Sequence, residues 1–165
     1  MKLLNWIQEW QIPEPAVVAD KPHSWSKRNV EIVKYIPNNC SVIDFGCGNR
    51  EILGYLSPTK YLGIDIEPTA NIVADLNQML PTDIPQGWDV GLLLGVLEYV
   101  NDPDQTLKNI VGYADQFFVL SLITGKKHNW QRAWTPDTID QCLRRHFASV
   151  EHHSFSKYIL SVCKK

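Results

Sequence analysis

The stretch VIDFGCGNRE at residues 42–51 constrains the fold of this chain more than any other stretch. An apolar, β-branched run ends in the carboxylate of Asp44, and Gly46 and Gly48 follow two residues apart. This pattern is typical of a short buried strand that leads through a tight turn into a helix. It predicts an open parallel sheet in which a ligand binds beyond the carboxyl ends of the strands.

Apolar runs and helix signals alternate along the rest of the 165 residues. We expect strands at 41–45, 61–66, 71–75, 88–96 and 116–123, and helices at 24–36, 51–56, 104–114 and 136–146. Asp102-Pro103 and Thr135-Pro136 open the last two helices, since each pairs a capping side chain with a proline at the first helical position. Two final strands, at 147–155 and 157–164, are joined by a tight turn around Ser156 and are therefore expected to be antiparallel. Strands separated by helices predict a parallel sheet that is covered on both faces.

The N-terminal residues 1–13 predict a short amphipathic helix. Leu3, Trp6, Ile7 and Trp10 recur at helical spacing, and Pro13 limits the extension of the helix. This helix either packs on its own domain or forms a flap or a subunit contact. We expect a single domain over residues 1–165, with an N-terminal helical cap at 1–37 and a sheet core at 40–165.

Charge and cysteine content exclude several functional classes. The net charge of −2 argues against a strongly basic nucleic-acid binder, and no apolar stretch is long enough to cross a membrane. Residues 1–125 are acidic and residues 126–165 are basic, which indicates either a solvated face or a surface that attracts an anion. The four cysteines form no C-x-x-C pair, so we expect reduced thiols, no metal site and a cytoplasmic location.

Three carboxylates, each at the end of an expected strand, indicate the ligand. The dinucleotide motif G-x-G-x-x-G fails because Glu51 occupies its last position, and no phosphate loop is present. Asp44 suits an ammonium group, and Asp65, 21 residues later, suits the two hydroxyls of a ribose. Asp75 can reach an adenine edge. S-adenosylmethionine combines a ribose, an adenine, an ammonium group and a carboxylate without any phosphate.

The stretches VIDFGCGN, YLGIDIEP, NIVADLNQMLP and WDVGLLLGVLEYVNDP resemble successive motifs of class I S-adenosylmethionine-dependent methyltransferases. The small Type 11/23 group, with its methionine-biosynthesis-associated members, is the most similar. The motifs cover roughly residues 40–125, and the expected strand order extends the resemblance to residue 165. The resemblance implies an α/β, Rossmann-like, seven-stranded mostly parallel sheet with helices on both faces and an antiparallel C-terminal strand.

The same resemblance implies a set of cofactor-binding residues. Those around the methionyl end of the cofactor are Asp44, Phe45, Gly46, Cys47 and Gly48. Asp65 binds the ribose and Ile66 flanks the adenine, while the residues at the adenine edge and near the sulfonium are Asp75, Leu76 and Gly95. Structural roles remain open for the three aspartates, which also cap helices and brace turns.

Two departures from the family pattern bear on the cofactor. Arg50 stands where a third glycine or another small residue is usual, in the expected first turn of a helix, where a cation opposes the helix dipole. Its side chain faces solvent, pairs with the cofactor's carboxylate, or crowds the site. Only nine residues separate Asp65 from Asp75, so the usual intervening helix is reduced to a turn.

The reaction and the acceptor are less constrained. Glu98, Tyr99 and His128 are candidate catalytic residues, although Glu98 and Tyr99 also fit a packed helix start and Tyr99 stands where the family often has a histidine. His23, Trp25 and Lys27 are candidates for the opposite wall of the site.

No [ND]PP[YFW] motif follows the fourth strand, which argues against methylation of DNA bases or glutamine. We expect O- or N-methylation of a small molecule, with no nucleic-acid or membrane partner and a possible homodimer. The alternative is a catalytically weak or inactive methyltransferase-like protein with a binding or regulatory role.

Overall fold

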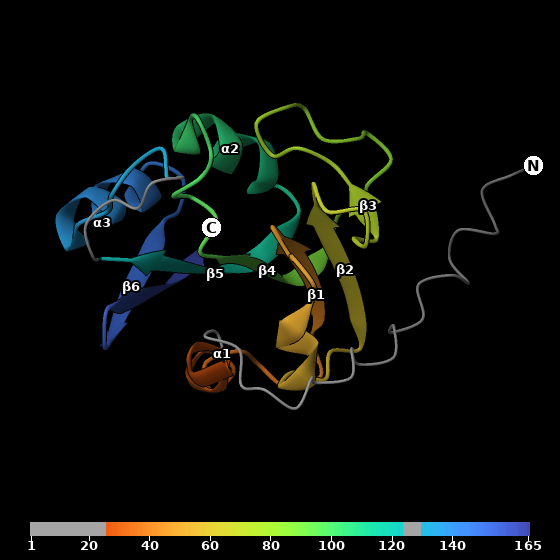
Figure 1. The fold of residues 1–165 in the computed structure, drawn as a ribbon, viewed down its shortest axis with the longest axis horizontal. Helices are drawn as coiled ribbons and strands as arrows, with labels where there is room; N and C mark the ends of the chain where they lie inside the picture. Colours follow the sequence, from red (N-terminus) through yellow and green to blue (C-terminus); the bar gives the residue numbers. More distant parts are fainter. Residues whose placement is uncertain (1–25, 124–129) are drawn as a thin grey trace, which may run out of the picture.

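The structure, a computed structural model, describes residues 26–123 and 130–165. A seven-stranded sheet runs through this part of the chain in the order β3-β2-β1-β4-β5-β7-β6 (Figure 1). The strands are β1 (Ser41–Phe45), β2 (Lys60–Asp65), β3 (Ile72–Val73), β4 (Trp88–Leu94), β5 (Ala114–Leu122), β6 (Ser149–Phe155) and β7 (Tyr158–Lys164). The expected helix at 1–13 lies outside the described residues, as do His23, Trp25 and His128.

The pairing of the strands confirms the predicted topology. The β1–β2, β1–β4, β2–β3 and β4–β5 pairs are parallel, whereas β7 is antiparallel to both β5 and β6. Strand order reverses between β1 and β4, because the chain adds β2 and β3 on one side of β1 and β4 on the other. This reversal is the switch point at which open α/β sheets bind their ligands.

Helices lie on both faces of the sheet (Figure 1), and each face has its own core. On one face, α2 (Pro103–Ile110) and α3 (Pro136–Arg144) bury apolar side chains such as Leu107, Ile110 and Ile139 against the sheet. On the other face, α1 (Ser26–Ile32) and the 3₁₀ turn η1 (Glu51–Gly54) contribute Ile32 and Ile52. The prediction of helices on both faces is therefore confirmed.

Local sequence signals explain where the helices begin. Asp102 caps α2 by accepting a hydrogen bond from the backbone N–H of Gln105, and Pro103 occupies the first helical position. Thr135 and Thr138 form a reciprocal capping box at the start of α3. Both helix starts agree with the prediction from sequence.

Several expected elements are shorter in the structure. The helix expected at 51–56 is the single 3₁₀ turn η1, because it follows a left-handed residue and is followed by the breaker Ser57-Pro58. The strand expected at 71–75 pairs over only Ile72–Val73, at the edge of the sheet. The helices expected at 24–36 and 104–114 end at Ile32 and Ile110, and Ala114 already belongs to β5.

A membrane span is not found among the helices of residues 26–123 and 130–165. Each of them is too short or too polar to cross a bilayer.

Candidate functional site

The loop after β1 lies at the switch point and is held by the end of β2. The backbone N–H groups of Gly46 and Cys47 donate to the Ile64 carbonyl oxygen, at 2.7 and 3.2 Å. Gly46 has a φ of 79°, and a Cβ there would overlap the side chain of Val96. Only glycine therefore fits this position. A Cβ at Gly48 would meet no atom within 4 Å, so the loop leaves open space on that side.

Asp44 is buried at the end of β1 with only one of its carboxylate oxygens bonded. The Tyr61 hydroxyl donates to Oδ2 at 2.7 Å, while Oδ1 has no hydrogen-bond partner. Burial raises the pKa of Asp44 to about 7, against the lowering effects of Tyr61 and Arg28. A buried acceptor atom without a donor is costly, and an ammonium group of a ligand would satisfy it. Tyr61 was not identified from the sequence, although its place at the start of the neighbouring strand is consistent with this contact.

The expected ribose and adenine residues follow β2 and β3. Asp65 accepts hydrogen bonds from the N–H groups of Gly48 (2.7 Å) and Glu67 (3.0 Å), so it ties the loop after β1 to the end of β2. Ile66 beside it is 67% exposed. Asp75 accepts from the backbone and side-chain nitrogens of Asn77, which is the turn-capping role that the sequence left open.

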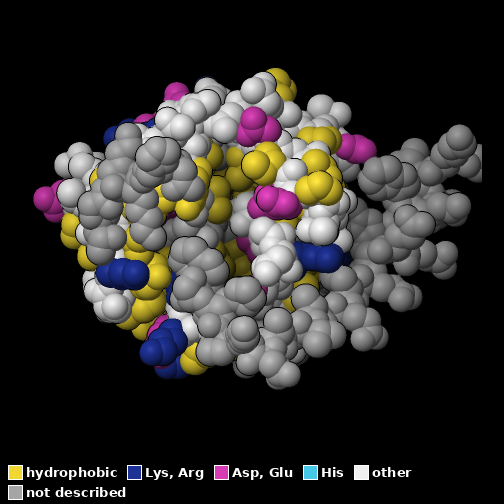
Figure 2. Space-filling model, in the orientation of Figure 1, with side chains coloured by type: hydrophobic (Ala, Val, Ile, Leu, Met, Phe, Trp, Pro, Cys, Tyr) yellow, Lys and Arg dark blue, Asp and Glu magenta, His cyan; other side chains and the backbone are white. Residues whose placement is uncertain are grey.

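Apolar side chains are exposed on the β3 side of the molecule. Ile66, Val73 and Met79 are all more than half exposed there, whereas Leu76 packs into the core. Figure 2 shows hydrophobic side chains gathered around a hollow near the centre of this face, with carboxylates close by. An exposed apolar surface of this kind suits one face of an aromatic ring.

The side chains of Phe45 and Cys47, two other residues of the implied site, pack within the protein. Phe45 points into the core, where its ring stacks on that of Phe117, so only its backbone belongs to the loop. Cys47 packs beside Gly63, and burial raises the pKa of its thiol, which keeps it protonated. Cys47 is therefore a small packing residue of the loop.

Arg50 adopts a left-handed conformation, with φ 60° and ψ 31°, immediately before η1. The prediction that Arg50 lies in the first turn of an α-helix is wrong, because Arg50 precedes η1, which is a 3₁₀ turn of only four residues. The expected opposition between the Arg50 cation and a helix dipole is therefore absent here. A left-handed position favours glycine, which gives a physical reason for the small residue usual in the family.

Glu98 and Tyr99 lie in the turns between β4 and α2. Glu98 is 1% exposed; its Oε1 accepts from the backbone N–H of Leu122 at 2.8 Å, and its Oε2 has no partner. Burial raises the pKa of Glu98. The Glu98 carbonyl oxygen accepts from Gln131, and the ring of Tyr99, 42% exposed, meets that of Trp130 edge-on at 6.2 Å. Glu98 thus braces β5 and the segment after it.

Arg28 was missed by the sequence analysis, which named its neighbour Lys27 instead. Lys27 is exposed, whereas Arg28 reaches from α1 to the end of β4, where Nη1 donates to the Leu94 carbonyl oxygen at 3.3 Å. A Cβ at Gly95 would lie 3.5 Å from the same nitrogen. Arg28 and Gly95 therefore flank the switch point together with Asp44. No sequence motif marks Arg28, since Leu94, which it contacts at the switch point, is 66 residues away in the sequence.

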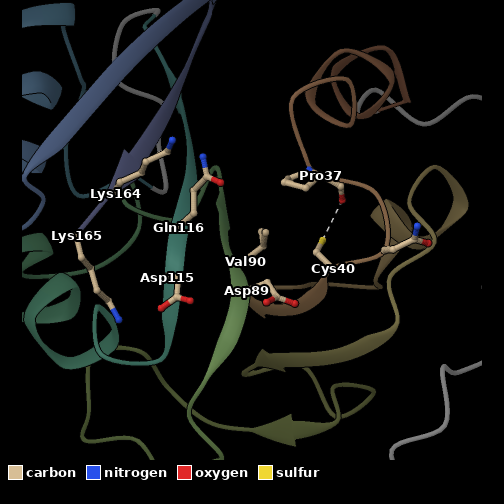
Figure 3. A pocket seen from close by; sticks show the side chains of 9 residues that line it. Pro37, Cys40, Asp89, Val90, Asp115, Gln116, Lys164 and Lys165 are labelled. Atoms are coloured by element: carbon tan, nitrogen blue, oxygen red, sulfur yellow. Dashed lines mark hydrogen bonds between the residues drawn. The ribbon is translucent and has the colours of Figure 1, made fainter.

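A second hollow lies at the opposite ends of the parallel strands, away from the switch point (Figure 3). It has a volume of about 510 Å³ and lies at the amino ends of β1, β4 and β5. Asp89 in its wall is engaged by the backbone N–H and hydroxyl of Ser41, both at 2.7 Å. Parallel sheets bind ligands at the carboxyl ends of their strands, whereas this hollow lies at the amino ends. Its polar side chains are also largely exposed. We assign it no function.

The described residues hold no metal-binding cluster of three or more His, Cys, Asp or Glu side chains. The groups gathered at the switch point are of the kinds that can hold an organic ligand. The switch point combines carboxylate oxygens of Asp44 and Asp65, open space at Gly48 and an exposed apolar residue, Ile66.

No model of a known protein family matches the sequence, and no curated protein is detectably similar to it. Solved structures are similar in fold. A TehB-like S-adenosylmethionine-dependent methyltransferase from Corynebacterium glutamicum aligns with 83% of this chain and 86% of its own, at a TM-score of 0.63 and 16% identity. An S-adenosylmethionine-dependent methyltransferase from Archaeoglobus fulgidus aligns with 86% and 95%, at 0.67 and 14%.

A third similar structure contains ligands. The 1,6-didemethyltoxoflavin-N1-methyltransferase from Burkholderia thailandensis, solved with 1,6-didemethyltoxoflavin and S-adenosylhomocysteine, aligns with 84% of this chain and 76% of its own. The TM-score is 0.64 and the identity 14%. The structural similarity establishes the fold, whereas identities this low leave the substrate open. The chain has the fold of the class I S-adenosylmethionine-dependent methyltransferases.

Proposed function

We propose that this chain is a methyltransferase that uses S-adenosylmethionine to methylate an oxygen or nitrogen atom of a small molecule. The observation that carries the proposal is the unpartnered Oδ1 of buried Asp44 at the switch point, beside a glycine loop anchored to Asp65. Asp44 is suited to the ammonium group, Asp65 to the ribose hydroxyls and Ile66 to the adenine ring. The cofactor supplies an activated methyl group on its sulfonium sulfur.

The residues of the chain bind and orient rather than react. Methyl transfer from a sulfonium requires chiefly that donor and acceptor are aligned, so positioned walls suffice for much of the acceleration. Tyr99, packed against Trp130, is the described candidate for the acceptor side. His128 remains the proposed base for an acceptor that must lose a proton.

The proposal includes a small-molecule acceptor and neither nucleic acid nor a membrane as partner. The acidic balance of residues 1–125 supports the absence of a nucleic-acid partner, because binding to a phosphate backbone depends on positive charge. Cys40, Cys47, Cys142 and Cys163 are free thiols, which fits the proposed cytoplasmic location. The proposal also includes a homodimer, which a measurement of the protein's mass in solution would test.

Thermal unfolding with S-adenosylmethionine, S-adenosylhomocysteine and NAD in parallel tests the cofactor. A ligand at about 100 times its Kd stabilises the protein by roughly 2.7 kcal/mol, or roughly 5–10 °C in Tm for a chain of this size. We expect this shift with both adenosyl ligands and none with NAD.

A matched pair of variants localises the binding. Asp65→Asn should remove most of the ligand-induced shift, whereas Asp89→Asn, the same change at the opposite edge of the sheet, should retain it. The absence of a shift with wild-type protein would contradict the proposal and favour the binding or regulatory role. With binding established, an acceptor screen that measures S-adenosylhomocysteine release identifies the substrate.

A further inference from the structure

Arg28 places a positive charge at the switch point from outside the motif-bearing part of the chain. Its guanidinium lies against the end of β4, with Nη1 3.3 Å from the Leu94 carbonyl oxygen, and its Nε donates to Asn29 Oδ1 at 3.2 Å. The end of β1 is the neighbouring strand end, since β1 and β4 are paired. The charge of Arg28 is therefore fixed in the gap where a ligand binds.

The surroundings of Arg28 are acidic. Burial lowers the pKa of Arg28, and the acidic groups that act in the opposite direction are Tyr158, Asp44, Glu51 and Glu98. A guanidinium remains charged under these conditions. The guanidinium of Arg28 thus places a positive charge among the carboxyl groups of Asp44, Glu51 and Glu98.

S-adenosylmethionine and S-adenosylhomocysteine differ at one atom in charge, since the sulfonium of the first is a neutral thioether in the second. We propose that Arg28 is a selectivity residue, whose positive charge lowers the affinity of the site for the sulfonium form relative to the thioether form. This inference rests on the proposed function. Any contact of Arg28 with the parts common to both ligands cancels in the ratio of their affinities.

The ratio of the two dissociation constants, measured by titration calorimetry, tests the inference. Arg28→Met removes the charge and keeps the length of the side chain, and it should shift the ratio by about tenfold in favour of S-adenosylmethionine, as expected for a unit charge in a partly buried site. Arg28→Lys keeps the charge and should keep the wild-type ratio. Lys27→Met removes a charge from the exposed side of the same helix and should also leave the ratio unchanged.

The outcomes separate the two proposals. Failure of wild-type protein to bind either ligand contradicts the proposed function itself. Binding of both ligands by Arg28→Met with an unchanged ratio overturns the role of Arg28 alone. Arg28→Gln, which retains a donor for Leu94, serves as the second uncharged variant if Arg28→Met does not fold. A folded Arg28→Gln that binds neither ligand would show a general binding role and would also overturn the inference.

Discussion

Two regions of the molecule differ in how their buried polar groups are hydrogen-bonded. One is the carboxyl edge, where the parallel strands end, and the other is the C-terminal unit, formed by α3, β6 and β7. In the C-terminal unit, His152 bridges the buried hydroxyl of Ser161 (2.9 Å) and the carboxylate of Asp140 (2.7 Å). Within residues 136–165, no buried side-chain polar atom lacks a partner. At the carboxyl edge, by contrast, Asp44 Oδ1 and Glu98 Oε2 have none.

The two regions thus differ in whether their buried polar groups are satisfied within the protein. A hydrogen-bond chain of serine, histidine and aspartate suggests catalysis, yet Ser161 is fully buried, so the chain joins α3 to the hairpin instead. Asp104 on α2 is likewise paired with Arg145 and His146, and the bond from Arg145 lowers its pKa to about 2. Polar groups satisfied within the protein stabilise it, whereas an unsatisfied buried atom such as Asp44 Oδ1 costs stability.

The largest expected effect follows from removing the charge of Asp44. The pKa of Asp44 is about 7 in the folded protein and near 3.9 in the unfolded chain. Between these two pH values the folded protein keeps the proton of Asp44, whereas the unfolded chain releases it. Stability therefore falls as pH rises from about 4 to 7. Asp44→Asn should raise the free energy of unfolding by about 4 kcal/mol at pH 8 and change it little at pH 4, as measured by urea denaturation.

Asp89 provides the control for this variant. Hydrogen bonds from Ser41 lower the pKa of Asp89, so its carboxylate is satisfied in the folded state. Asp89→Asn should leave stability unchanged or lower it at pH 8. A destabilising effect of Asp44→Asn at the same pH would mean that Asp44 is paired like the residues of the C-terminal unit, and the comparison would fail.

A smaller effect of opposite sign is expected in the C-terminal unit. His152→Ala leaves the hydroxyl of Ser161 buried without a partner and should cost about 2 kcal/mol. Adding Ser161→Ala should recover about 1 kcal/mol, which a double-mutant cycle measures. His153→Ala at the adjacent, partly exposed position serves as the control and should cost less. A loss below about 0.5 kcal/mol for His152→Ala would show that the bridge is not structural.

The smallest effect concerns backbone strain, which both regions contain. Arg50 and Ser156 have φ values of 60° and 53°, and glycine at either position should stabilise the protein by about 1 kcal/mol, or roughly 3 °C in Tm. The two variants should differ in ligand binding. Ser156→Gly should not alter the affinity for S-adenosylmethionine, and an unchanged affinity in Arg50→Gly would rule out pairing of Arg50 with the cofactor's carboxylate.

Much of the fold could be predicted from local signals. The strand at 41–45 is bounded by Asn38-Asn39 and Gly46, and Asp102-Pro103 and Thr135-Pro136 mark helix starts, so these elements agree to the residue or nearly so. The helix after Arg50 was overpredicted because backbone conformation at a single residue is not visible in hydrophobic periodicity. The length of the third strand depends on its partner, which a pattern within one strand does not reveal.

The sequence identifies candidate site residues only where a motif marks them. The loop at 44–48 and Asp65 follow from motifs, and the structure places them in contact through Gly48. Arg28 and Tyr61 reach the site from elements with no motif of their own, and their roles depend on packing across the sheet. Contacts between distant segments require the three-dimensional arrangement, since periodicity describes one element at a time.

The order of the strands also has a consequence for the edges of the sheet. In the described sheet β6 pairs only with β7, so the C-terminal hairpin lies between the edge of β5 and solvent. Without the hairpin, the edge of β5 would be open, and its FFVLSL segment is uncharged and rich in β-forming residues. Such an edge is prone to aggregation. The hairpin therefore replaces it with the edge of β6, whose sequence SVEHHSF is more polar.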